Sequence, residues 1–256
     1  MAPFNTILLL GATSGLGESA AKRLLGQGKK VIVTGRRQAR LNALKAEGLE
    51  TYAMDVSDLA AIPKHLDTLF STFPDIDTVW INSGIATRYS VKDINSCSDA
   101  DLTLEVTTNL TAAAIIARHT IPRFLARGEH VESHFLITTS GLGFVPIPSF
   151  PVYNACKAGL HYFLVSLRQQ LKDSPVNVIE IVPPYVATEY VRENREQAPK
   201  NLQAMSLKDY EDEVFAQLDN IPAKELKEVA AGPSALRVKA WRDSLGAMVA
   251  KSPFTD

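Results

Sequence analysis

Short apolar segments rich in β-branched residues alternate with segments of helical periodicity along most of this chain. The first apolar run, at residues 5–10, is continuous rather than alternating, which is typical of a strand buried on both faces. We predict strands at residues 5–10, 30–34, 50–54, 78–81, 134–138 and 176–182, and helices at residues 16–27, 38–47, 58–70, 99–127 and 152–172. Because strand–helix–strand connections are right-handed, this alternation predicts an α/β fold: a doubly wound, mostly parallel sheet of six to seven strands with helices on both faces.

A glycine-rich segment, Gly11–Gly17, lies between the first predicted strand and the first predicted helix. Glycines allow a tight turn there and let a pyrophosphate approach the backbone, while the helix amides face the anion. A glycine-rich turn without function is the alternative, but the complete strand–helix–strand setting favours a dinucleotide site in a Rossmann fold. The predicted contacts in this segment are Gly11, Thr13, Ser14, Leu16 and Gly17.

Two arginines follow the second predicted strand, where an acid that binds the ribose of NAD(H) would be expected. The segment reads Thr34-Gly35-Arg36-Arg37, so no carboxylate is present to accept from a 2′-hydroxyl or to repel a 2′-phosphate. Guanidinium groups can pair with that phosphate through two hydrogen bonds. We therefore predict NADP(H) as the cofactor, and a solvated basic pair that opens a helix is the alternative.

Composition excludes several classes of protein. The 27 basic and 28 acidic residues give a formal net charge of −1, which argues against nucleic-acid binding. Cys97 and Cys156 are too few for a disulfide scaffold and indicate a reducing compartment. The longest apolar run near the start, Ile7–Leu10, is too short for a signal peptide or a membrane span. We expect a cytoplasmic protein that binds neither nucleic acid nor membranes.

Two prolines bear on the predicted helix ends, and the C-terminal part of the chain has its own predicted elements. Pro63 should lie in the first turns of a helix that Asp58 caps, and Pro122 should bend or end the helix at residues 99–127 early. After Thr188 we predict a polar helical segment at residues 189–203, a helix at 210–218, a short strand at 228–231 and a terminal helix at 234–251. Without a linker or a repeat, the chain is predicted to be a single domain over residues 1–256, with a substrate lid at 189–220 and a helical extension at 232–252.

A phenol and an ammonium group lie four residues apart, at Tyr153 and Lys157, on one face of a predicted helix. A tyrosine with a pKa of about 10 is a poor acid–base catalyst at neutral pH, but a neighbouring cation lowers that pKa. Such a pair alone is usually structural.

Together with Gly11–Gly17, however, the pair resembles the short-chain dehydrogenase/reductase family, whose motifs are Gly-x-x-x-Gly-x-Gly and Tyr-x-x-x-Lys. The resemblance extends over residues 5–190. It implies further cofactor contacts from Asp55, Val56, Asn82, Ser83, Gly84, Pro183, Val186 and Thr188.

The same resemblance implies four catalytic residues. Tyr153 would be the general acid in reduction and the base in oxidation, and Ser140 would hold the substrate oxygen against it. Lys157 would bind the nicotinamide ribose and tune Tyr153, and Asn109 would orient a water of the proton relay through a main-chain carbonyl. Ser140 could instead cap a turn before Gly141, and Asn109 could be a solvent-exposed helix residue.

Apolar side chains surround the predicted site and suggest a hydrophobic carbonyl substrate, with core packing as the alternative. They are Leu142, Phe144, Val145, Ile147, Phe150, Tyr185 and Tyr190. The five histidines lack zinc-site spacing, so no metal is predicted.

We therefore expect an NADPH-dependent enzyme that interconverts a ketone or aldehyde and an alcohol. An oxidative alcohol dehydrogenase and a non-catalytic NADP(H) sensor are the alternatives, although a sensor would be expected to have lost Tyr153 or Lys157. The resemblance also implies a homodimer or homotetramer built on the helices at 99–127 and 152–172.

Overall fold

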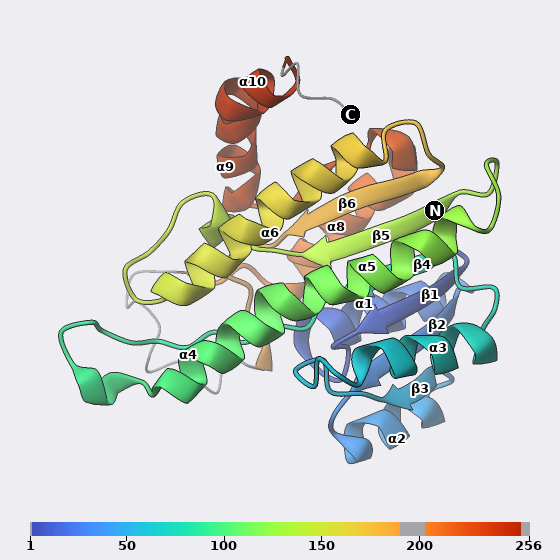
Figure 1. Cartoon of the computed structure of the whole chain (residues 1–256), viewed down its shortest axis with the longest axis horizontal. Coiled ribbons are helices and arrows are strands. Elements are labelled where there is room, and N and C mark those ends of the chain that lie inside the picture. The colour runs from blue at the N-terminus through green and yellow to red at the C-terminus, as the bar shows by residue number, and fades with distance from the viewer. Residues whose placement is uncertain (1, 190–202, 252–256) are drawn as a thin grey trace.

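A seven-stranded parallel sheet runs through the centre of the protein, shown as a computed structural model in Figure 1. The structure describes residues 2–189 and 203–251. Within them the strand order is β3-β2-β1-β4-β5-β6-β7, and every neighbouring pair is parallel. The strands are β1 (Thr6–Leu10), β2 (Lys30–Gly35), β3 (Glu50–Ala53), β4 (Thr78–Ile81), β5 (Ser133–Thr138), β6 (Val176–Val182) and β7 (Glu228–Ala230). The predicted doubly wound sheet is thereby confirmed.

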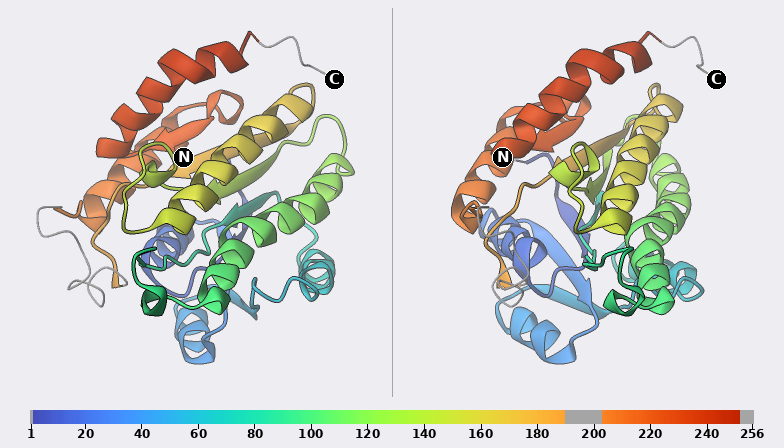
Figure 2. Two further views of the ribbon diagram at one scale, coloured as in Figure 1. Left: turned by 60° about the vertical axis from the view of Figure 1, so that its left-hand side comes forward. Right: turned by 90° about the vertical axis from the view of Figure 1, so that its left-hand side faces the viewer.

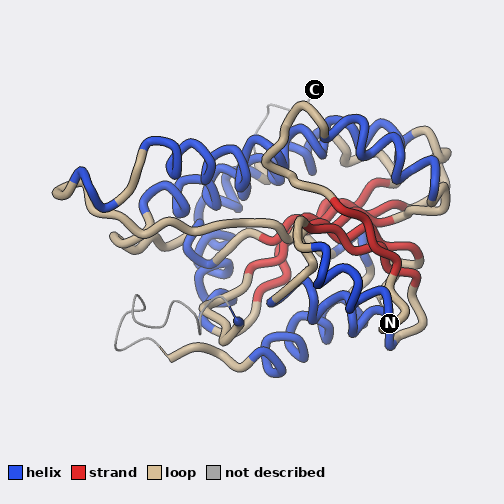
Figure 3. The backbone as a smooth tube through the Cα atoms, turned by 90° about the horizontal axis from the view of Figure 1, so that it is seen from below, coloured by secondary structure: helices blue, strands red, loops and turns tan. Residues whose placement is uncertain are grey.

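Helices cover both faces of this sheet (Figure 3). Helices α1, α2 and α8 pack on one face, and α3, α5 and α6 pack on the other. Their bounds are α1 (Gly15–Gly26), α2 (Gln38–Ala46), α3 (Ile62–Thr72), α4 (Asp99–Val106), α5 (Ala112–Leu125), α6 (Pro151–Gln170), α8 (Leu207–Asn220), α9 (Pro233–Trp241) and α10 (Ala247–Val249). Single turns are the 3₁₀ segments η1 (Ile94–Ser96), η3 (Gly141–Gly143) and η5 (Ala223–Glu225), and the π-helical segments η2 (Thr107–Thr111) and η6 (Arg242–Gly246).

Strand β1 shows why the two layers form. All five of its residues are buried, and successive side chains point to opposite faces of the sheet. Ile7 and Leu9 therefore join the core under α1 and α8, whereas Leu8 and Leu10 join the core under α3 and α5. A continuous apolar run is what a strand between two helical layers requires.

The ends of two helices differ from the prediction. Helix α3 begins at Ile62 rather than at Asp58, whose carboxylate accepts from the backbone N–H of Ala61 and so caps the turn before the helix. Pro122 does not end the helix at its own position, because α5 continues to Leu125, and a bend at Pro122 stays a prediction. Pro122 lies in the last turn, where only one main-chain hydrogen bond is lost and few residues remain to be disturbed.

The long helix predicted at residues 99–127 is interrupted elsewhere. Helices α4 and α5 are joined by the π-helical turn η2 at Thr107–Thr111, which no proline marks. The terminal helix is likewise divided into α9, η6 and α10, and it stands beside the β7 edge of the sheet (Figures 1 and 2).

The segment predicted to be a lid lies largely outside the described residues, since residues 190–202 belong to the part that is not described. Its C-terminal part is α8, which buries Tyr210, Val214, Phe215 and Leu218 in the core. The lid therefore stays a prediction. Among the helices of residues 2–189 and 203–251, none is both long enough and apolar enough to cross a membrane.

Candidate active site

A cavity of about 1060 Å³ opens at the carboxyl ends of the strands. Its walls include the residues that directly follow β1, β3, β4, β5 and β6. Ligands of doubly wound sheets bind in this place, next to the point where the strand order reverses, here between β1 and β4. The volume slightly exceeds the roughly 300–1,000 Å³ that is usual for ligand pockets, as a dinucleotide with a substrate would need.

Most of the predicted site residues line this cavity. They are Gly11, Thr13, Ser14, Leu16, Arg36, Arg37, Asp55, Val56, Asn82, Ser83, Gly84, Ser140, Tyr153, Lys157, Pro183, Val186 and Thr188. Gly17 and Asn109 do not line it, although both are buried directly behind the wall.

The glycine-rich loop is held tightly against the end of β4. Gly11 has a φ of +81°, and a Cβ built on it would lie 2.5 Å from the Cα of Ser83. A Cβ on Gly17 would lie 2.5 Å from the carbonyl oxygen of Gly11, which also accepts a hydrogen bond from Asn82 Nδ2. Both positions therefore require glycine, one for its conformation and its space and the other for space alone.

The N-terminus of α1 faces the cavity without a side-chain cap. Ser14 is the N-cap residue in an extended conformation, and its hydroxyl makes no capping hydrogen bond to the helix. The first N–H groups of an uncapped helix attract anions, because they lack partners and carry the positive end of the helix dipole.

The two arginines after β2 line the same end of the cavity. Arg37 donates through Nη2 to Thr13 Oγ1 at 3.0 Å and to Ser14 Oγ at 2.6 Å. Arg36 is exposed, with its Nη1 3.6 Å from Asp55 Oδ2. Burial raises the pKa of Asp55, but hydrogen bonds from Ser57 and the charge of Arg36 outweigh it, so the pKa of Asp55 falls below its usual value. This end of the cavity is cationic.

Lys157 and Tyr153 lie at the opposite end, on the first turns of α6. The Lys157 ammonium is buried, donates to the carbonyl oxygen of Thr138 at 2.9 Å and lies 5.5 Å from the centre of the Tyr153 ring. Burial lowers the pKa of Lys157 to about 8, against the opposing influence of Cys156 and Glu180. At neutral pH the ammonium form still dominates, so a positive charge stands beside the phenol.

Asn109 is buried in the π-helical turn η2, so the alternative of a solvent-exposed residue is excluded. Its Nδ2 donates to the carbonyl of Ile85 at 2.7 Å, and its Oδ1 accepts from the N–H of the same residue at 2.9 Å. A Cβ on Gly84 would lie 3.2 Å from Asn109 Oδ1 and 3.6 Å from Lys157 Nζ. The end of β4 thus brings Asn109 and Lys157 close together, and the π turn provides the position, as such turns often do at functional sites.

Ser140 caps a turn, as one alternative expected, and it also lies where the catalytic role would require it. Its Oγ accepts from the N–H of Leu142 at 3.1 Å and caps η3, and the residue also lines the cavity. A hydroxyl that accepts one hydrogen bond still has its proton to donate to a ligand.

The residues expected on the substrate side divide into two groups. Leu142, Ile147, Phe150 and Tyr185 line the cavity. Phe144 instead packs against the rings of His161 and Trp241, and Val145 is 48% exposed. Tyr190 lies outside the described residues.

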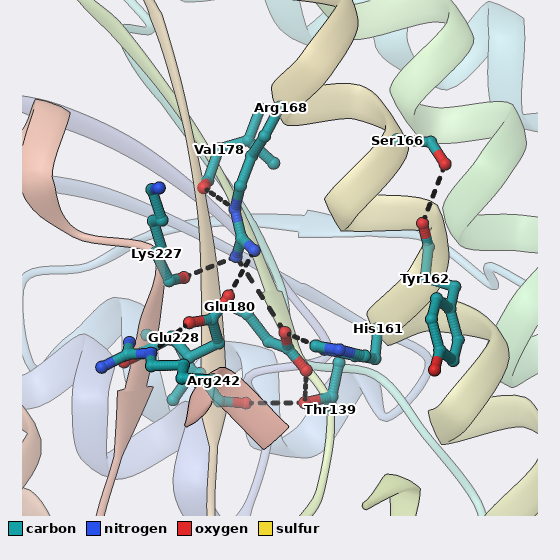
Figure 4. A network of polar contacts seen from close by, with 11 residues as sticks. Thr139, His161, Tyr162, Ser166, Arg168, Val178, Glu180, Lys227, Glu228 and Arg242 are labelled. Atoms are coloured by element: carbon teal, nitrogen blue, oxygen red, sulfur yellow. Dashed lines mark hydrogen bonds and ion pairs between the residues drawn. The ribbon is translucent and has the colours of Figure 1, made fainter. Parts of the chain in front are cut away.

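A buried carboxylate behind Ser140 was not singled out by sequence analysis. Glu180, within β6, accepts from Thr139 Oγ1 at 2.6 Å and lies 2.8 Å from Nδ1 of His161 on α6 (Figure 4). The sequence contains a signal for Glu180, because a charged residue within the apolar run of this strand is unusual. Glu180 therefore connects α6 to the residue that precedes Ser140.

The network continues to the C-terminal helices. Arg168 lies 4.0 Å from Glu180 and 2.5 Å from a carboxylate oxygen of Glu228, whose other oxygen pairs with Arg242 Nε at 2.7 Å (Figure 4). Burial raises the pKa of the Glu228 carboxyl, but the two arginines outweigh it and hold that pKa below its usual value. These ion pairs fasten β7 and η6 to α6.

Residues from the C-terminal part of the chain also line the cavity, and no sequence motif predicted this. Met205 and Ser206 contribute from the segment before α8, and Ser234 and Arg237 contribute from α9. Within the described residues, no group of three or more His, Cys, Asp or Glu side chains could hold a metal ion.

Known proteins are similar to this chain in sequence and in fold. A family model described as short chain dehydrogenase matches residues 5–199. The uncharacterized oxidoreductase DltE of Bacillus subtilis is 32% identical over 210 residues, which cover 80% of this chain and 81% of that protein. The NADP-dependent 3-hydroxy acid dehydrogenase YdfG of Escherichia coli K12 is 34% identical over 180 residues, 69% of this chain and 71% of that protein.

A solved structure shows the same arrangement of the chain. The closed form of a serine dehydrogenase complexed with NADP+ superposes with a TM-score of 0.76 at 29% identity. The superposition covers 90% of this chain and 95% of the other.

Proposed function

The chain belongs to the short-chain dehydrogenase family, and we propose that it is an NADP(H)-dependent oxidoreductase that interconverts a ketone or aldehyde and an alcohol. The observation that carries the proposal is the arrangement of one cavity, with Tyr153, Lys157 and Ser140 at one end and Arg36 and Arg37 at the other. A phenol beside a buried cation suits proton transfer, and a cationic pocket after β2 suits a 2′-phosphate.

The residues present fit a bound dinucleotide. The uncapped N–H groups of α1 would bind the pyrophosphate, and Arg36 and Arg37 would bind the 2′-phosphate. Lys157 would bind the nicotinamide ribose, for which it would exchange or share its hydrogen bond to Thr138. When bound, the cofactor supplies the hydride in reduction and accepts it in oxidation. The serine dehydrogenase with NADP+, which has the same fold, supports this choice.

We assign the proton chemistry to Tyr153. During reduction its hydroxyl gives a proton to the carbonyl oxygen of the substrate, and during oxidation the phenolate takes the proton from the alcohol. The Lys157 ammonium, 5.5 Å from the centre of the Tyr153 ring, stabilises the negative charge on the phenolate. Ser140 donates its free hydroxyl proton to the same substrate oxygen and fixes the distance to Tyr153.

Asn109 holds the backbone next to the predicted catalytic residues in place. Its two hydrogen bonds to Ile85 fix the chain after β4, next to Gly84 and Lys157. We assign to Asn109 the orientation of a water of the proton relay through a main-chain carbonyl.

Consumption of NADPH tests the proposal, with NADH measured in parallel against a panel of ketones and aldehydes. Tyr153→Phe keeps the ring and removes the proton donor, so we expect turnover to fall by ~10²–10⁴-fold, the usual contribution of a general acid. The matched control is Tyr162→Phe, since Tyr162 lies on the same helix with 48% of its surface exposed. Turnover that survives in Tyr153→Phe, or falls equally in both variants, contradicts the mechanism.

A further inference from the structure

A buried hydroxyl without a partner and an arginine lie together on α9, on the wall of the cavity. Ser234 is 1% exposed, and within the described residues its Oγ has no hydrogen-bond partner. Arg237 follows three residues later on the same face of the helix, and both side chains line the cavity. Because buried polar groups are nearly always hydrogen-bonded, a hydroxyl without a partner beside a cavity is a candidate contact for a ligand.

Both side chains lie against the residue that follows Ser140. A Cβ built on Gly141 would collide with Ser234 Oγ, and it would lie 3.1 Å from Arg237 Nη1. The lack of a side chain at Gly141 thus lets the hydroxyl and the guanidinium reach the backbone next to the predicted catalytic serine. Any substrate held by Ser140 therefore has a cationic and hydrogen-bonding group beside it.

The charge of Arg237 has no counter-ion in the described part of the chain, since no carboxylate there lies within 4.0 Å of it. The two acids of the cavity wall are occupied elsewhere. Asp55 accepts from Ser57 and faces Arg36, and Asp209 accepts from Ser206 at the start of α8. Among the described residues, the Arg237 guanidinium is therefore available to pair with an anionic ligand.

The helix that carries the pair is held in place before any ligand binds. Arg242, in the turn after α9, pairs with Glu228 at 2.7 Å, and the ring of Trp241 lies 4.3 Å from that of His161. Val238 is buried between Ser234 and the helix end. A guanidinium on such a support loses little freedom on binding.

We propose that Arg237 and Ser234 bind a carboxylate of the substrate, so that the enzyme reduces oxo acids and oxidises hydroxy acids. The inference rests on the proposed function and deepens it. A guanidinium pairs with a carboxylate through two hydrogen bonds, and the Ser234 hydroxyl supplies a third donor. The apolar side chains of Leu142, Ile147 and Phe150 then contact the carbon chain.

A comparison of the turnover of an acid with that of its ester distinguishes a carboxylate site from a purely apolar one. Oxidation of 3-hydroxybutanoate and of its methyl ester is measured with NADP+ in the wild type, Arg237→Met and Ser234→Ala. We expect Arg237→Met to lower kcat/KM for the acid by ~10–100-fold and to leave the ester essentially unchanged, because a hydrogen bond to a charged group is lost only with the acid. Lys239→Met is the control, since this lysine is an exposed cation of the same helix that pairs with Asp243.

Ser234→Ala separates ligand binding from a structural role. The hydroxyl has no partner in the described residues, so its removal should weaken acid turnover without lowering the melting temperature. A lower melting temperature with equal losses for acid and ester would show that Ser234 is only structural.

Calorimetric titration of the NADP+ complex with 3-hydroxybutanoate keeps the two proposals apart. Turnover of the ester by a wild type that neither binds nor oxidises the acid overturns the carboxylate site alone. Binding of the acid through Arg237, without turnover of acid or ester, overturns the proposed function instead. Equal effects of Arg237→Met on acid and ester also overturn the carboxylate site.

Discussion

The buried ammonium group of Lys157 should make the stability of the protein depend on pH. In the folded protein burial lowers the pKa of Lys157 to about 8 from its ordinary value of 10.5. In the unfolded chain the Lys157 side chain is exposed to water and has its ordinary pKa. Between these two pKa values the unfolded state therefore binds more protons than the folded state, and the free energy of unfolding rises with pH.

The size of this effect follows from the two pKa values. A shift of one unit corresponds to ~1.4 kcal/mol, so the full contribution is about 3 kcal/mol. Most of it, ~2–3 kcal/mol, should appear between pH 7 and pH 10, because the folded group has lost its proton by then and the unfolded group largely has not. The burial cost is fully present below pH 8 and disappears as pH rises toward 10.5.

Urea unfolding at pH 7 and pH 10 measures the effect. Other groups also titrate in this window, so the quantity of interest is the difference in pH dependence between the wild type and Lys157→Met. Lys92→Met, at an exposed lysine, is the control and should keep the pH dependence of the wild type. If Lys157→Met also kept it, the ammonium would not be desolvated in the folded protein, and the argument for a buried charge beside Tyr153 would be refuted.

Two further predictions concern the nucleotide end of the cavity. Gly17→Ala should cost ~1–3 kcal/mol through the clash with the Gly11 carbonyl, whereas Gly26→Ala in the same helix, with nothing within 4 Å, should stabilise by ~0.4–1 kcal/mol. Thermal unfolding compares the two, and equal shifts would contradict the tight packing of the loop. Arg36→Ala should raise KM for NADPH by ~10-fold or more and leave that for NADH unchanged. Equal changes for both cofactors would exclude a contact of Arg36 with the 2′-phosphate.

Local sequence patterns predicted most of the nucleotide half. Strand β4 has the predicted bounds and β1 differs by one residue, since continuous apolar runs leave little choice of position. The π turn at Thr107–Thr111 was not predictable, because no residue type marks an inserted helical residue. Its effect is that Asn109 is buried next to Gly84 rather than exposed.

The substrate end was harder to predict for a different reason. Ser234 and Arg237 are ordinary helix residues, and only the folded chain brings them to Gly141 from a distant part of the sequence. The proposal that they bind a ligand depends on their having no partner within the described residues, and a sequence does not reveal which side chains lack partners. Glu180 was easier to predict from the sequence, since a carboxylate within an apolar strand needs a buried partner.

The position of α9 in the chain bears on how such an enzyme can change in evolution. The match to the family model ends at residue 199, whereas α9 begins at Pro233, after the last strand of the sheet. The nucleotide end of the cavity and the helix that adds Ser234 and Arg237 to its other end are thus encoded by separate stretches of the gene. Mutation or exchange of the later stretch can give an enzyme a new substrate while the inherited nucleotide site stays intact, which makes the C-terminal helix a natural target for redesign.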